Sequence, residues 1–131
     1  MNPMHFFVYG TLRRGQSNYQ RLLDGNEKFE FVGPATTVNK YTMLSSGIPF
    51  VHKEPATSTI KGEVFMVWGN KLVKSMDALE GHRDGERQGY HREQTLVRLD
   101  NGVNMLAWLY FYYGVHHGTV VQSGDWLNRN K

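Results

Sequence analysis

The sequence predicts an α+β domain that is mostly β-strand, with a small, curved, partly closed sheet flanked by short helices. Three observations predict this fold class. Apolar and β-branched runs outnumber helical patterns along the 131 residues. The clearest amphipathic helix lies between two such runs, without the regular strand–helix alternation of a parallel sheet. The turn sequence Asp100-Asn101-Gly102 joins the last two long runs, as is typical of a β-hairpin.

The first quarter of the chain predicts one strand and one short helix. The run from His5 to Tyr9 is apolar on both faces and ends at a glycine, so we expect a buried strand in a central position. A helix is then expected to begin at Ser17 or Asn18 and to end at Gly25.

The rest of the chain is organised around a second helix. From Phe29 to Pro55 the pattern is loose, with a short β-like piece at Thr36 to Leu44. Clearer elements follow: a strand at Ile60 to Trp68, a helix at Lys71 to Glu80 capped by Asn70, and hairpin strands at Tyr90 to Leu99 and Val103 to Tyr113. Trp126 and Leu127 are expected to fix the end of the chain.

Length and composition exclude several classes of protein. The 131 residues are expected to form one domain, 1–131. Hydrophobic residues make up 40% and the net charge is +3, a scattered excess that does not indicate nucleic-acid binding. The absence of cysteine excludes disulfides and thiol chemistry. Neither a signal peptide nor a membrane helix is visible, so we expect a cytoplasmic protein with no membrane partner. The sequence does not indicate the oligomeric state.

Glu80 is the most unusual polar residue of the second helix. Helical spacing places it on the same arc as the apolar residues Val73 and Met76. Burial would raise the pKa of its carboxyl group, as a general acid/base near neutral pH requires. The same residue also fits a frayed last turn, where it would reach water and pair with Arg83 or Arg87.

Other polar groups give weaker indications. His116 and His117 are adjacent and would point to opposite faces of a strand, so we expect neither a metal site nor a metal cofactor. Ser45, Ser46 and His52 form no recognisable catalytic triad.

Five arginines are expected at the surface. They are interpreted as solvated side chains; the alternative is a basic rim that favours anionic ligands. They are Arg13, Arg14, Arg83, Arg87 and Arg92.

Three segments together carry a family resemblance that covers nearly the whole chain. They are VYGTLRRG at residues 8–15, MDALEGH at 76–82 and GYHRE at 89–93. In this order they resemble the gamma-glutamyl cyclotransferase-like family, of the gamma-glutamylamine cyclotransferase type. The ending SGDWL resembles a short bacterial branch of that family.

The resemblance implies a small, partly closed β-barrel flanked by helices, with a cavity between the Tyr-Gly-Thr-Leu loop and the helix that carries Glu80. Glu80 would be the catalytic carboxylate. The substrate would be bound by Tyr9, Gly10, Thr11, Leu12 and Tyr110. Tyr90 and Arg92 would be mainly structural. The implied partner is a small-molecule substrate, and no cofactor is needed.

The implied reaction releases 5-oxoproline from a gamma-glutamyl compound, because the substrate's α-amine attacks its own side-chain carbonyl. Such a ring closure needs positioning and proton transfer but no enzyme nucleophile. We expect Gly10 to permit a close approach and an unusual φ at the end of the first strand, so that backbone N–H groups point into the cavity. The alternative hypothesis is a non-catalytic binder of a small anionic metabolite in the same cavity.

Overall fold

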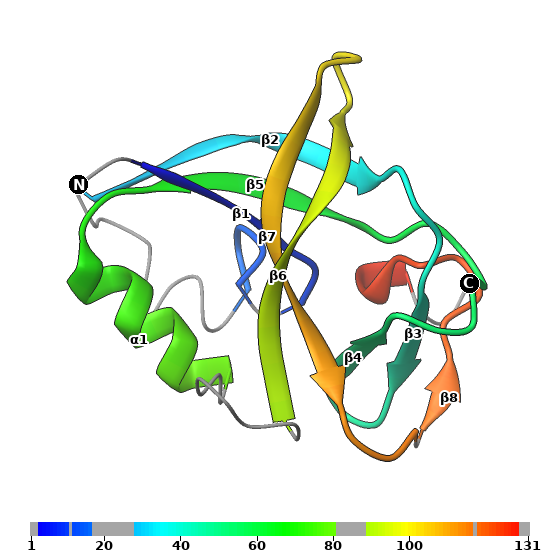
Figure 1. Ribbon diagram of the computed structural model, residues 1–131. Helices are drawn as coiled ribbons and strands as arrows, with labels where there is room; N and C mark the ends of the chain where they lie inside the picture. Colours follow the sequence, from blue (N-terminus) through cyan, green and yellow to red (C-terminus); the bar gives the residue numbers. More distant parts are fainter. Residues whose placement is uncertain (1–2, 11, 17–27, 81–88, 117, 129–131) are drawn as a thin grey trace.

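Five strands form one sheet that closes on itself. The computed structural model describes residues 3–10, 12–16, 28–80, 89–116 and 118–128. Around the ring (Figure 1) the order is β1 (Met4–Val8), β5 (Lys61–Val67), β2 (Phe29–Thr37), β6 (Gly89–Leu99) and β7 (Asn104–Tyr113). The ring closes through a narrow parallel seam between β1 and β7, where Phe6 pairs with Trp108. The predicted α+β class, mostly strand, is confirmed.

A small second sheet and the helices complete the described part of the chain. The second sheet has the order β4 (Pro49–His52), β3 (Thr42–Ser45), β8 (Thr119–Val120). The helix α1 (Asn70–Glu80) and the small sheet lie on opposite sides of the β6–β7 hairpin in Figure 1. A 3₁₀ turn, η2 (Trp126–Asn128), follows. Among the described residues there is no helix of the length and apolar character that crossing a membrane requires.

Strand β1 is central, as its two apolar faces predict. It lies between β5, to which it is antiparallel, and β7. Successive side chains of a strand point to opposite faces. Phe7 accordingly belongs to the cluster inside the ring, whereas Phe6 and Val8 belong to a second cluster that packs under α1. One strand therefore serves two hydrophobic cores.

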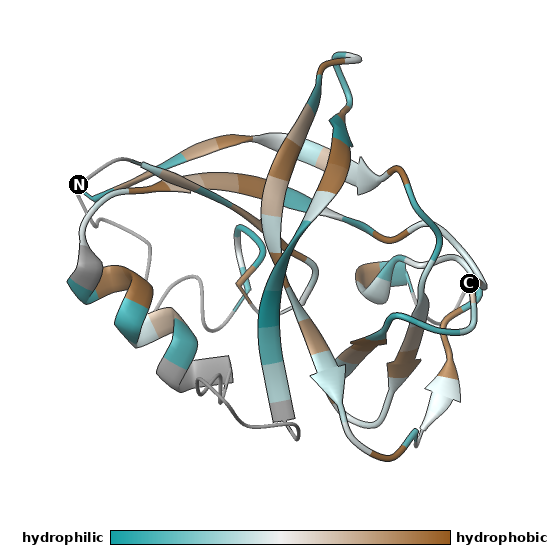
Figure 2. Cartoon of the chain, in the orientation of Figure 1, coloured by the Kyte–Doolittle hydropathy of each residue, from teal (hydrophilic) through white to brown (hydrophobic). Residues whose placement is uncertain are grey.

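The predicted helix and hairpin are also confirmed. The β6–β7 hairpin pairs from Gly89 with Tyr113 to Arg98 with Asn104, next to the expected turn. On α1 the predicted apolar residues Val73 and Met76 are buried, together with Leu72. Figure 2 shows the resulting alternation of apolar and polar segments along the helix.

The loose region is more regular than the sequence predicts. Residues 29–35 belong to β2, and the expected β-like piece from Thr36 to Leu44 is interrupted, because β2 ends at Thr37 and β3 begins at Thr42. The pairing of β2 with β5 absorbs a register shift between Phe31 and Gly33. A local pattern does not predict such a bulge, since partner strands set it.

Two smaller expectations have mixed outcomes. At the end of the chain Trp126 is buried as expected, but Leu127 is 38% exposed. Of the two residues expected to fix this end, Trp126 does so by burial and Leu127 does not. The short helix expected from Ser17 or Asn18 to Gly25 lies outside the described residues.

We predict that Met76→Ala destabilises the protein by about 2–5 kcal/mol, because Met76 is fully buried between α1 and the outer face of the ring. The measurement is urea unfolding followed by circular dichroism. Lys74→Ala, an exposed residue of the same helix, is the matched control and should change stability by less than about 0.5 kcal/mol. Equal losses in the two variants would contradict the packing of α1 against the ring.

Candidate functional site

The chain leaves β1 through a tight hydrogen-bonded turn. Tyr9 and Gly10 are both buried. The N–H of Arg13 donates to the carbonyl of Gly10 at 2.9 Å, which closes what we term the Gly10–Arg13 turn. The carbonyl of Arg13 then accepts from the N–H of Gln16 at 3.0 Å, in a second turn. The backbone of Arg13 therefore belongs to both turns.

A side chain at position 10 is excluded by the close approach of a neighbouring residue, and not by the backbone φ of Gly10. Gly10 is not among the described glycines with positive φ. A Cβ atom at this position would lie 2.7 Å from Cγ of Pro49, the first residue of β4. The close approach seen here is to a side chain of the small sheet, and the expected role of Gly10 in directing backbone N–H groups into a substrate cavity stays a prediction. The end of β1 packs directly against the small sheet.

Hydrogen bonds join Tyr9, the late strand and the helix. The hydroxyl of Tyr9 donates to the carbonyl of Tyr110 on β7 at 2.7 Å. The hydroxyl of Tyr110 donates to Oδ1 of Asp77 on α1 at 2.6 Å. Arg92 of β6 donates from Nε to the same oxygen at 2.9 Å, and its guanidinium lies over the ring of Trp108. Asp77 therefore joins α1 to β6 and β7 by hydrogen bonds, beside the apolar contacts of the helix.

The predicted substrate residues that the structure describes lie close to these bonds. Tyr110 is only 3% exposed, and Leu12 packs in the outer cluster together with Tyr110 and Met76. Thr11 lies outside the described residues. The backbone of Glu80 ends α1, one turn after Asp77, whereas its side chain lies outside the described part. Their contacts with a substrate stay predictions.

The structural roles expected for Tyr90 and Arg92 agree with their contacts. Tyr90 donates from its hydroxyl to the carbonyl of Pro49 at 2.8 Å and stacks on Phe50. Arg92 holds Asp77 through its Nε. These two residues of β6 connect the ring to the small sheet and to the helix.

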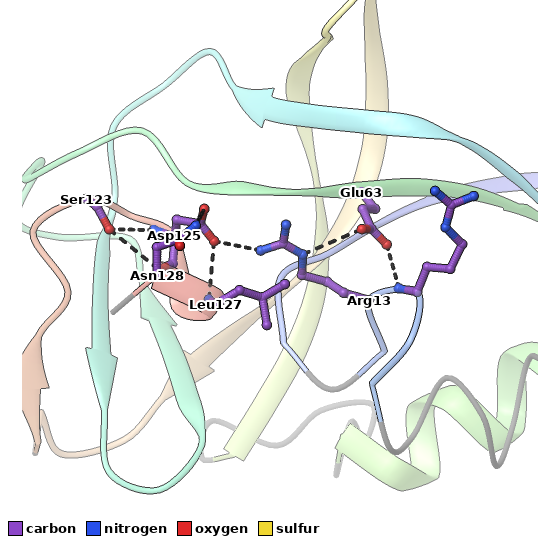
Figure 3. A network of polar contacts seen from close by, with 7 residues as sticks. Arg13, Glu63, Ser123, Asp125, Leu127 and Asn128 are labelled. Carbon is purple, nitrogen blue, oxygen red and sulfur yellow. Dashed lines mark hydrogen bonds and ion pairs between the residues drawn. The ribbon is translucent and has the colours of Figure 1, made fainter. Parts of the chain in front are cut away.

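Two of the arginines expected at the surface are held by carboxylates and by the core. The guanidinium of Arg13 donates from Nη1 to Oδ1 of Asp125 at 2.8 Å, and its Nε lies 3.8 Å from Oε2 of Glu63 (Figure 3). Its side chain is only 12% exposed. Arg14 donates its backbone N–H to Glu63 at 2.6 Å and places its guanidinium over Phe31. The solvated interpretation is therefore wrong for Arg13.

The carboxyl of Asp125 has a pKa below its ordinary value of 3.8. Burial on its own would raise this pKa. The hydrogen bonds from Asn128 and Arg13, the charge of Arg13 and the N–H of Leu127 together outweigh the burial and lower it. Asp125 therefore stays ionised at neutral pH and holds Arg13 as a charged partner.

An open groove of about 1290 Å³ lies between the segment after β4 and the end of β7. It is lined by none of the predicted site residues; its lining includes His52, Tyr112 and His116. The ring centroids of His52 and His116 lie 3.7 Å apart, and the two rings are tilted by 39° to one another. The described residues contain no group of three or more side chains suited to hold a metal, and His117 lies outside them.

The sequence reasoning missed the residues that hold the turn and the helix. Asp77 stands three positions before Glu80, and Asp125 lies in the SGDWL segment, which served only as a family likeness. A signal existed for Asp77, because a carboxylate one turn from a candidate catalytic residue on a helix faces a similar direction. No local signal pairs Arg13 with Asp125, which lie 112 positions apart.

We predict that the stability difference between the wild type and Asp125→Asn depends on pH. Because the folded-state pKa of Asp125 is lowered, its contribution is fully present above about pH 3.8 and is lost as the pH falls through the folded-state value. Urea unfolding between pH 7 and pH 2 measures this difference, with Asp100→Asn, at the exposed hairpin turn, as the control. A difference that persists unchanged to pH 2 would show that the charge of Asp125 is unimportant.

Comparisons with known proteins agree with the geometry. The chain matches the family described as gamma-glutamyl cyclotransferase, AIG2-like, over residues 6–128. A protein of Methanocaldococcus jannaschii, provisionally named a gamma-glutamylcyclotransferase, is 39% identical over 122 residues, which cover 93% of this chain and 94% of the relative. Gamma-glutamylaminecyclotransferase B of Danio rerio is 33% identical over 132 residues, 94% of this chain and 63% of that protein.

A solved structure extends the likeness to three dimensions. The crystal structure of an AIG2-like protein from mouse superposes with a TM-score of 0.77 and 24% identity, over 94% of this chain and 88% of that one. At this identity the match concerns the fold. The family match spans nearly all of the sequence, and the ring, the helix and the loop after β1 occur together in this structure. The chain therefore belongs to the gamma-glutamyl cyclotransferase, AIG2-like family.

Proposed function

We propose that this protein is an enzyme that releases 5-oxoproline from a gamma-glutamyl amine or gamma-glutamyl amino acid. The α-amine nitrogen of the substrate attacks its own γ-carbonyl carbon, and a new carbon–nitrogen bond closes the ring. The bond from that carbon to the leaving amine then breaks. Glu80 takes a proton from the substrate's ammonium group and gives one to the nitrogen of the leaving amine.

The observation that carries this proposal is the hydrogen-bonded connection from Tyr9 through Tyr110 to Asp77. It joins the loop after β1, the late strand and the helix that ends at Glu80, which are the three elements that the family resemblance assigns to the site. Tyr9, Gly10, Thr11, Leu12 and Tyr110 are the residues that we assign to substrate binding. The Danio rerio relative, whose name refers to gamma-glutamylamines, supports an amine as the leaving group.

The contacts of the arginines argue against the alternative of an anion-binding protein without catalysis. An anion binder would use cationic side chains that are available to the ligand. Among the described residues, Arg13 is held by Asp125, Arg92 donates to Asp77, and the guanidinium of Arg14 lies over Phe31. Arg83 and Arg87 lie outside the described residues, and the described part of the basic rim lends this alternative no support.

We predict that Glu80→Gln preserves folding and product binding but lowers kcat by about 10²- to 10⁴-fold, the usual contribution of a general acid/base. Glutamine has nearly the same shape as glutamate but cannot accept the ammonium proton. The assay measures 5-oxoproline release from a panel of gamma-glutamyl amines and amino acids. Glu93→Gln, the same substitution on β6, is the control and should retain activity. Normal turnover by Glu80→Gln would mean that the carboxylate is structural.

Gly10→Val should affect binding instead of the chemical step. Its branched side chain would meet Pro49, where even a Cβ atom approaches to 2.7 Å, so the end of β1 and β4 would have to separate. We expect weaker binding of 5-oxoproline in calorimetric titrations, together with a lower melting temperature. Unchanged affinity in this variant would remove Gly10 from the proposed binding site.

A further inference from the structure

The segment before η2 is tightly fitted against the beginning of β5. Gly124 has φ +70°, and a Cβ atom there would lie 1.9 Å from the carbonyl oxygen of Thr59. The carbonyl of Gly124 accepts a hydrogen bond from the N–H of Lys61 at 2.8 Å. Trp126, two residues later, is buried in the interior cluster. Asp125 therefore lies between Gly124 and Trp126, two residues whose positions are fixed by their close packing.

The carboxylate of Asp125 is also oriented by its own neighbours. Its Oδ2 accepts from the side-chain amide of Asn128 at 2.7 Å, and its Oδ1 accepts from the N–H of Leu127 at 3.2 Å. The N–H of Asp125 donates to the hydroxyl of Ser123 at 3.2 Å. Figure 3 shows Ser123 and Asn128 on one side of Asp125 and Arg13 on the other. The acceptor is thus held in place by groups other than the arginine.

Arg13 connects the fixed carboxylate of Asp125 to the loop after β1. Its side chain reaches Asp125 and lies beside Glu63, which pairs with Val8, the last residue of β1. All three charged side chains are 11–13% exposed, so solvent screens the ion pairs much less than it would at the surface. The backbone of Arg13 closes the Gly10–Arg13 turn. Two carboxylates from distant parts of the chain therefore meet at one turn.

We propose that Asp125 is a positioning residue for the substrate site: by holding Arg13 it fixes the Gly10–Arg13 turn in the place where the substrate is bound. This inference rests on the proposed function. In this role Asp125 acts through Arg13 and not on the reacting atoms. The role explains why the carboxylate of Asp125 is held by Leu127 and Asn128, far in sequence from the loop that it positions.

Hydrogen exchange tests the effect on the turn independently of activity. In Asp125→Asn we expect the amide hydrogen of Arg13 to exchange about tenfold faster or more, because only the closed turn protects it. The amides of β1 should exchange as in the wild type. Arg13→Lys, which keeps the charge but loses the planar guanidinium, should show a smaller increase and provides a second test if Asp125→Asn folds poorly.

Kinetics test the effect on the substrate. In Asp125→Asn we expect KM for the gamma-glutamyl substrate to rise about 10- to 100-fold, with a much smaller change in kcat, because the ring-closing groups are unchanged and the binding loop is displaced. Asp100→Asn at the exposed hairpin turn is the matched control and should leave both constants unchanged.

The outcomes separate this inference from the proposed function. An unchanged exchange rate of the Arg13 amide would overturn the inference, whatever the activity. Faster exchange with an unchanged KM would overturn it as well, because the turn would then move without consequence for the substrate. If the wild type turns over no gamma-glutamyl compound, the proposed function fails, and the exchange rate alone then decides whether Asp125 fixes the turn.

Discussion

The position of β1 is the constraint on which the rest of the structure depends. This strand is covered on both faces, by the interior cluster on the side of Phe7 and by the cluster under α1 on the side of Phe6 and Val8. Its contact with β5 is so close that a Cβ atom at Gly62 would lie 2.2 Å from the carbonyl oxygen of Val8. Because β1 contributes side chains to both clusters, the point where the chain leaves the strand is fixed by both.

The chain then enters a loop that is held from two sides. On one side Tyr9 and Tyr110 lead by hydrogen bonds to Asp77 of α1. On the other side Arg13 is held by Asp125. Breaking one partner of a buried ion pair typically costs about 3–5 kcal/mol, whereas exposed pairs contribute about 0–1 kcal/mol. The Lys53–Glu93 pair, with side chains 46% and 37% exposed, belongs to the second kind. The charges near the loop therefore matter more than this exposed pair.

This rigidity suits the chemistry that we propose. In an intramolecular ring closure the nucleophile and the carbonyl belong to one molecule, so the enzyme gains most by holding that molecule in a reactive shape. A fixed loop with close backbone approach is a suitable holder, and one carboxylate can carry the protons. Family membership establishes the fold, whereas the reaction depends on the residues of the site itself.

The sequence by itself determined the elements whose signals are local. The double-faced apolar run of β1, the stripe of α1 and the Asp-Asn-Gly turn each report a periodicity or a turn preference that a few neighbouring residues carry. The family motifs are also short contiguous runs, so the sequence alone was enough to indicate the family. Only the tertiary structure decided the rest. The course of β2 and β3, the reason for Gly10 and the partner of Arg13 all depend on residues distant in sequence. Pro49 and Asp125 become neighbours of the first loop only in the folded protein, because contacts between residues distant in sequence, and not local preference, bring them there.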